Sequence, residues 1–101
     1  MTKKVFKRGL NDLIVFSIYS AGDKCTFEEL VKECFSRFPE SFSFPKIKKW
    51  PDARKLDRPL RVLRKRKLIK GGPKTYFSLT KLGKDKAKEI AKFFSQGRLK
   101  I

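Results

Sequence analysis

The sequence predicts a mainly α-helical protein with one small β-hairpin and a single hydrophobic core. Four stretches place apolar residues at helical spacing, and a glycine-rich turn separates two short segments with β propensity. A capping box at residues 26–29 marks the start of one helix. At 101 residues the chain suffices for one modest core but not for two, so we expect one domain over residues 1–101.

The first helix is expected over residues 8–20. It is apolar on more than one side, with Leu10, Leu13, Ile14 and Ile18 on one face and Val15, Phe16 and Tyr19 beyond it. Gly22 follows at the position where a left-handed backbone commonly ends a helix. Such a helix either lies at the centre of the core or buries its second face in a homodimer.

The second helix is expected over residues 26–38, where Thr26 and Glu29 form the capping box. The apolar residues of the amphipathic pattern are Phe27, Leu30, Val31, Cys34, Phe35 and Phe38. Pro39 is expected to end this helix. Lys24 and Cys25, just before the capping box, can form a short strand.

Residues 39–51 form an irregular connection in this prediction. The connection is long for a helix–helix loop, and it contains three prolines. It also contains Phe42, Phe44, Ile47 and Trp50. A purely solvated loop would not carry these residues, so part of the connection is expected to pack back on the core.

Residues 52–67 are the most informative part of the chain, because they carry two opposed stripes. At about 100° per residue, one side of a helix takes Ala53, Leu56, Leu60 and Leu63, and the other takes Arg54, Arg58, Arg61 and Lys65. Asp52 is the expected N-cap, and Asp57 is the only later acid in the segment. The cationic side therefore needs an anionic partner from outside, and its dimensions suit a DNA major groove. The alternative is a solvated basic face on an ordinary surface helix.

Pro59 leaves two local structures open for this segment. Either one helix is kinked at Pro59, or a short helix at 52–57 precedes a second helix that has Pro59 in its first turn.

A hairpin is expected over residues 68–79, with Gly71, Gly72, Pro73 and Lys74 as its turn. The last helix is expected over residues 80–95, with Leu82, Ala87, Ile90, Ala91 and Phe94 on its inner side. Gly97 is expected to lie just past the end of this helix.

The charge and composition limit the classes of function that this protein can have. The formal net charge is +17, from 27 Lys and Arg against 10 Asp and Glu, and a folded domain with this much self-repulsion usually has a polyanionic partner. The chain has no His and only two Cys, so we expect no metal site, no cofactor and no catalytic residues. Cys25 and Cys34 are expected to be free thiols. No apolar segment approaches the roughly 18 residues of a membrane span and no signal peptide is apparent, so a cytoplasmic protein is expected.

The order of helix, capped helix, basic helix, glycine-rich hairpin and helix resembles the winged helix-turn-helix superfamily. Residues 60–72, LRVLRKRKLIKGG, look like a recognition helix that stops before Leu-Ile and leads into the wing hairpin. Residues 77–84, FSLTKLGK, are similar to the Leu-Thr-x-x-Gly junction that follows the wing in many prokaryotic regulators. The resemblance covers residues 8–95. It departs from the pattern at the long 39–51 connection, where three or four residues are usual, and at Lys67, where many members have glycine.

The resemblance implies a three-helix core with a wing and a C-terminal helix, and a protein that binds double-stranded DNA. The basic helix would face the major groove through Arg54, Lys55, Arg58, Arg61 and Lys65. The wing would follow the backbone or minor groove with Lys70, Lys74 and Tyr76. The connection would add phosphate contacts from Lys46, Lys48 and Lys49.

We therefore expect a transcriptional regulator or a nucleoid-type DNA binder without a small-molecule ligand. The second hypothesis is a ribosome-associated RNA-binding protein, which would need exposed aromatic residues beside the basic patch. A protein–protein interaction module ranks third, because it would not need the cationic stripe. Homodimerisation through the terminal helices is also expected, since Phe16 and Phe93 both lie outside the best core faces of their helices.

Overall fold

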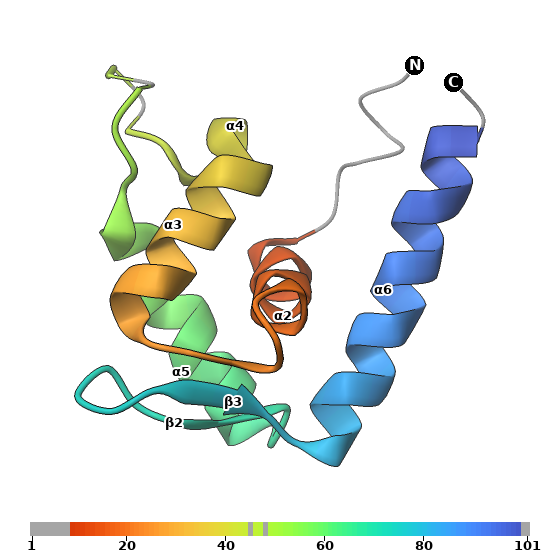
Figure 1. The fold of residues 1–101 in the computed structure, drawn as a ribbon. Coiled ribbons are helices and arrows are strands. Elements are labelled where there is room, and N and C mark those ends of the chain that lie inside the picture. Colours follow the sequence, from red (N-terminus) through yellow and green to blue (C-terminus); the bar gives the residue numbers. More distant parts are fainter. Residues whose placement is uncertain (1–8, 45, 48, 100–101) are drawn as a thin grey trace.

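The computed structural model describes residues 9–44, 46–47 and 49–99 of the chain. It is mainly helical with a small three-stranded antiparallel sheet, as the sequence predicts (Figure 1). The elements in chain order are α2 (Leu10–Ser20), β1 (Lys24–Cys25), α3 (Phe27–Arg37), α4 (Pro39–Phe42), η1 (Ala53–Leu56), α5 (Asp57–Lys65), β2 (Ile69–Gly71), β3 (Phe77–Leu79) and α6 (Lys81–Leu99). Among the helices of the described residues, none is both long and apolar enough to cross a bilayer.

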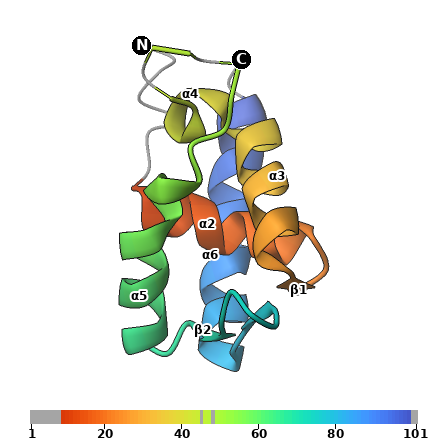
Figure 2. The same ribbon diagram turned by 90° about the vertical axis from the view of Figure 1, so that its left-hand side faces the viewer.

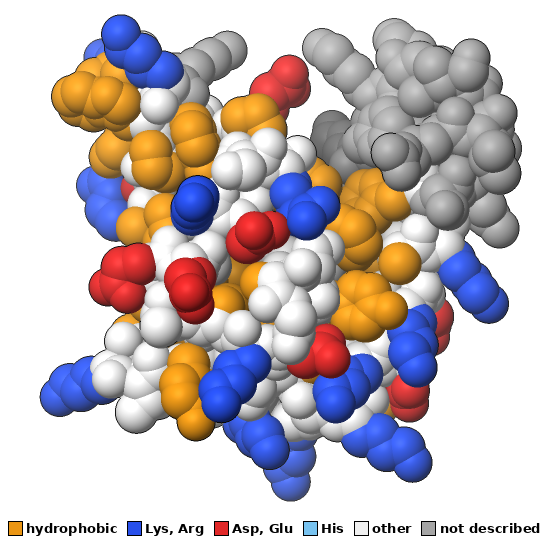
Figure 3. All heavy atoms as spheres, viewed as in Figure 1, with side chains coloured by type: hydrophobic (Ala, Val, Ile, Leu, Met, Phe, Trp, Pro, Cys, Tyr) orange, Lys and Arg blue, Asp and Glu red, His pale blue; other side chains and the backbone are white. Residues whose placement is uncertain are grey.

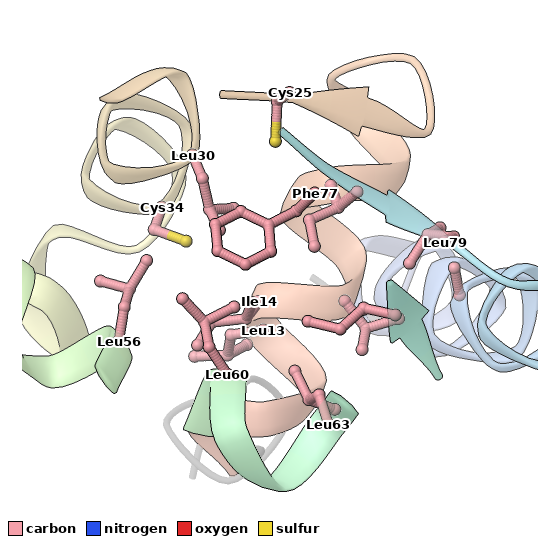
Figure 4. Close-up of a cluster of buried hydrophobic side chains, with 14 of the residues drawn as sticks. Leu13, Ile14, Cys25, Leu30, Cys34, Leu56, Leu60, Leu63, Phe77 and Leu79 are labelled. Atoms are coloured by element: carbon pink, nitrogen blue, oxygen red, sulfur yellow. The ribbon is translucent and has the colours of Figure 1, made fainter. Parts of the chain in front are cut away.

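Helix α2 lies at the centre of the molecule, with α3 and α5 on one side, α6 on the other and the sheet beneath it (Figures 1 and 2). Ile14, Val15 and Ile18 have no exposed surface. Figure 4 shows α2 residues pointing toward leucines of α5 and toward β3. Gly22 has a φ of 96°, so it ends α2 in the left-handed conformation that its sequence position predicts.

The second apolar face of α2 is covered within the same chain. The Phe16 ring lies 4.9 Å from the Phe94 ring and 6.2 Å from the Phe38 ring. Tyr19 and Phe93 are half-buried and pack against the core. Of the two alternatives for this helix, the central position therefore accounts for its extra apolar residues. A homodimer is no longer needed to explain them, and it stays a prediction that sedimentation can test.

Helix α3 begins with the predicted capping box. The Thr26 hydroxyl accepts from the Glu29 amide at 3.2 Å, and the Glu29 carboxylate accepts from the Thr26 amide at 2.9 Å. Leu30 and Cys34 are fully buried on its inner face. The connection after α3 is not wholly irregular as predicted, because Pro39 occupies the first turn of the short helix α4, where its missing N–H costs nothing.

The basic segment over 52–67 is broken near Pro59 rather than one continuous helix. A 3₁₀ turn, η1, is followed by α5, which places Pro59 in the first turn of an α-helix. This is the second of the two alternatives that Pro59 left open. Helix α5 ends at Lys65 because Lys67 has a φ of 61°, and the Leu68 amide turns back to the Leu63 carbonyl at 3.0 Å. Lys67 thus adopts a backbone conformation that glycine usually supplies at a helix end.

The sheet has the order β1-β3-β2, so the predicted strand at Lys24–Cys25 is confirmed and joins the hairpin as its third strand. Cys25 pairs with Phe77, and Ile69 pairs with Leu79. The hairpin strands are shorter than expected, and residues 72–76 form the turn. Gly71 has a φ of 100°, and a Cβ there would lie 1.9 Å from the Tyr76 carbonyl oxygen, so the turn requires glycine.

Helix α6 is longer than the predicted 80–95 and includes Gly97 rather than ending before it. Its inner face contains Ala87, Ile90 and Phe94, as expected. Leu82 is 57 % exposed, so its predicted place on the inner side is wrong. Gly83, one residue later, takes that place because only a hydrogen fits against the Leu68 carbonyl.

Candidate nucleic-acid interface

The two stripes of residues 53–65 occupy opposite sides of η1 and α5, as the sequence predicts. Leu56, Leu60 and Leu63 are at most 6 % exposed and hold the segment on the core. The outward side is cationic and exposed at Arg54, Arg58, Arg61 and Lys65. Lys55, the fifth predicted residue of this helix, is half-buried. Because the leucines fix the helix, the orientation of the cations does not depend on a partner.

The cations of this segment differ in their pairing. Arg54 donates through Nε to Oδ1 of Asp52 at 3.2 Å, and this hydrogen bond lowers the pKa of the Asp52 carboxyl. The expectation that Arg54 has no acidic partner within its own segment is therefore wrong. In the described part of the chain, no carboxylate pairs with Arg58, Arg61 or Lys65. These three positive charges are available to a ligand.

The hairpin is hydrogen-bonded to α5 through an arginine that belongs to neither of the two stripes. Arg64 donates through Nη1 to the Gly71 carbonyl at 3.1 Å. A groove of about 330 Å³ lies between α5, the hairpin and the start of α3, and its lining includes Arg61, Arg64 and the acid Asp57. The predicted hairpin cations, Lys70 and Lys74, are both exposed. The bond from Arg64 is thus one contact between the helix and the hairpin that carry these two groups of cations.

The connection between α4 and η1 is anchored at its base and exposed at its outer end. Phe42 is 1 % exposed, and its carbonyl accepts from the Asp52 amide at 2.6 Å. The expectation that the aromatic residues pack on the core thus holds for Phe42, whereas Trp50 is 56 % exposed. Lys46 and Lys49 are exposed, and Lys48 lies outside the described residues.

The basic segments lie in one row. The connection adjoins the start of η1, and the hairpin adjoins the far end of α5 (Figures 1 and 2). Residues 54–74 hold ten of the 27 Lys and Arg with Asp57 as their only acid, whereas residues 9–44 hold six acids and three cations. Figure 3 shows acidic side chains over α3 on the face turned to the viewer. The positive charge is therefore concentrated on particular elements rather than spread evenly.

The two cysteines are buried and free. Burial raises the pKa of Cys25 to about 11 and that of Cys34 to about 12. Both thiols are therefore protonated at neutral pH, and a protonated thiol is neither a nucleophile nor a good metal ligand. The described residues include no group of three or more His, Cys, Asp or Glu side chains that could hold a metal ion.

Two features of this surface were missed from the sequence. At 100° per residue, Arg64 falls roughly 60° from Arg61, at the edge of the cationic stripe, and only the folded hairpin gives it an acceptor. The exposure of Trp50 was also not predicted: Phe42, Phe44 and Trp50 were the candidates for exposed stacking residues, but anchoring of the connection on the core was the preferred interpretation. The three lysines around it were the available signal.

Comparison with known proteins identifies no family for this chain. No protein-family model, curated protein or solved structure matches the chain. Function must therefore be inferred from the surface itself.

Proposed function

We propose that this protein is a winged helix-turn-helix protein that binds double-stranded DNA. In this proposal α5 enters the major groove and the β2–β3 hairpin follows the backbone or minor groove. The observation that carries it is the outward face of α5, where Arg58, Arg61 and Lys65 are exposed without carboxylate partners on a helix fixed by buried leucines. A second support is the chain order of α2, α3, α5, the β2–β3 hairpin and α6, with β1, α4 and η1 inserted between them.

The contacts divide by chemistry. Arginine can donate two parallel hydrogen bonds to guanine O6 and N7, so Arg58 and Arg61 would read base edges. Lys70 and Lys74 on the hairpin, and Lys46 and Lys49 on the connection, would meet phosphates, which position the protein without specifying sequence. Bound in this way, the protein would act on nucleoid DNA in the cytoplasm, as a regulator or as a general binder.

One observation favours a second candidate, an RNA-binding protein. Trp50 is exposed beside Lys49, and such aromatic residues stack on the unpaired bases of RNA. The deep, narrow major groove of an RNA helix would not admit α5, however. We therefore place duplex DNA first.

A salt series tests the proposal directly. If the surface neutralises about six to ten phosphates, the logarithm of the association constant should fall with the logarithm of salt concentration at a slope of about −5 to −9. The measurement is competition binding to random duplex DNA, single-stranded DNA and structured RNA by anisotropy. A slope near −1, or tighter binding to RNA than to duplex DNA, would contradict duplex binding through this surface.

The proposed assignment of base contacts to α5 and phosphate contacts to the hairpin can be tested with two single variants. Arg61→Ala should cost about 1–3 kcal/mol on a selected site and relax the base preference there, because a base contact is lost. Lys74→Ala should weaken all sequences about equally and reduce the salt slope by about one, because only a phosphate contact is lost. Equal behaviour of the two variants on selected and random DNA would identify a non-specific binder.

A further inference from the structure

The exposed end of the connection between α4 and η1 combines aromatic and cationic side chains. We name residues 43–51 the Trp50 loop; its residues 45 and 48 lie outside the described part. Trp50 is 56 % exposed and Ile47 is 42 % exposed, and they are two of four exposed large hydrophobic residues in the described chain. Lys46 and Lys49 are exposed beside them, and the loop contains no acid. An exposed indole costs solvation free energy, so a role for it should be sought.

Trp50 is presented by a supported backbone rather than by a free loop. The Trp50 carbonyl accepts from the Phe44 amide at 3.1 Å, and the Trp50 amide donates to the Ile47 carbonyl at 3.2 Å. Below them, Ser43 and Pro51 form an antiparallel bridge. The indole therefore stays exposed with its backbone already ordered, and a ligand would not have to order it.

The loop is continuous with the cationic face of η1 and α5. The Arg54 guanidinium carbon lies 5.4 Å from the centre of the Phe44 ring, and the Nε of the same guanidinium donates to Oδ1 of Asp52. Asp52 itself is buried beneath the loop. Thus Arg54 of η1 contacts the loop, and the loop joins the cationic segment at the η1 end of α5 (Figure 2).

The chemistry of the loop selects its partner. Lysine side chains bind anions, and an exposed indole stacks on planar apolar groups. A nucleic-acid strand offers both, because each base has a stacking face beside a phosphate. An anionic membrane would also attract lysines, but a membrane-surface element needs a long apolar face, and the large hydrophobic side chains that the described residues of this loop expose are Trp50 and Ile47 alone.

We propose that the Trp50 loop is a base-stacking site, in which Trp50 stacks on an unpaired base while Lys46 and Lys49 contact the flanking phosphates. This inference builds on the proposed function: the preferred ligand becomes a DNA duplex with an unpaired base beside the paired segment held by α5. A base inside an intact duplex is already stacked on both sides, so Trp50 gains little there.

The chain has one tryptophan, so its fluorescence reports on this site alone. The full chain is titrated with a paired duplex, the same duplex with one unpaired thymine, and an RNA hairpin with an unpaired uracil. We expect strong quenching and tighter binding with the unpaired thymine. Trp50→Ala lacks the tryptophan, so its binding is followed by the anisotropy of labelled DNA. It should lose that preference, a loss of roughly 5- to 150-fold, since stacking on an aromatic residue is worth about 1–3 kcal/mol per base. Trp50→Phe should keep much of it.

Leu82→Ala is the matched control, because Leu82 is equally exposed but lies on α6. It should leave both affinities unchanged. If Trp50→Ala also leaves the preference unchanged, or if anionic phospholipid vesicles shift the Trp50 emission to the blue while DNA does not quench it, this inference is overturned. Steep salt-dependent binding to paired duplex would then leave the proposed function standing. Quenching by the unpaired uracil together with tighter RNA binding would support base stacking and overturn the duplex-DNA function.

Discussion

Replacing Arg58, Arg61 and Lys65 together by alanine is expected to weaken duplex binding on the order of 100-fold or more, since each lost contact costs about 1 kcal/mol or more. These side chains are exposed cations of α5 for which the described residues include no carboxylate partner; Arg64, the fourth exposed cation of α5, is left unchanged because it bonds the Gly71 carbonyl. The slope of log affinity against log salt should fall by about three if each meets a phosphate, and by less if arginines read bases. Alanine favours helix, so the fold should be kept, which circular dichroism can check.

The matched control instead removes three lysines of α6 that lie beyond its first turn: Lys86→Ala, Lys88→Ala and Lys92→Ala. Both triple variants lower the net charge by three from +17, so they differ only in where the charge is removed. The α6 variant should lose less than about 5-fold in affinity, because charges beyond a Debye length are screened. Equal losses in the two variants would mean that net charge alone drives binding, and α5 would not be the interface.

Gly83→Ala is expected to destabilise the protein, although helix propensity predicts the opposite. In a helix, replacing glycine by alanine gains about 1 kcal/mol. At this position, however, a Cβ would lie 2.0 Å from the Leu68 carbonyl oxygen, which also accepts from the Thr80 amide at 3.1 Å. Moving that carbonyl disturbs the entry to β2, and overpacking of this kind costs up to about 3 kcal/mol. The net loss should be about 2 kcal/mol, which lowers the melting temperature by roughly 8–16 °C.

Thermal unfolding of Gly83→Ala beside Gly72→Ala measures this effect. A Cβ at Gly72 would lie 3.5 Å from Nη1 of Arg64, an ordinary contact, so this control should stay within about 0.5 kcal/mol of the unchanged chain. A stabilised Gly83→Ala variant would mean that α6 does not approach Leu68 this closely.

The contacts around Thr80 explain why the Leu-Thr-x-x-Gly junction is informative. The Thr80 hydroxyl donates to the Lys67 carbonyl at 2.6 Å and accepts from the Gly83 amide at 3.1 Å. It thereby joins the end of α5 to the start of α6, while Gly83 provides the close approach. The sequence alone showed the motif, but only the folded chain shows what it connects.

Local signals in the sequence were sufficient for the elements whose ends are chemically marked. The capping box at Thr26 and Glu29, the left-handed Gly22 and the glycine-rich turn all appear where expected, because each depends on residues within a few positions of one another. The opposed stripes of η1 and α5 were predictable for the same reason. Pro59 left two structures open, since both satisfy the local backbone.

Tertiary packing decided what depends on distant residues. The extra apolar face of α2 is covered by Phe38 and Phe94, which only the fold brings to Phe16. The exposure of Trp50 and Leu82, and the bond from Arg64 to the hairpin, likewise follow from the three-dimensional arrangement. The sequence by itself thus determined the helices, the turn and the cationic stripe. Which side chains remain available to a partner was determined by long-range contacts, because burial is a property of the whole fold.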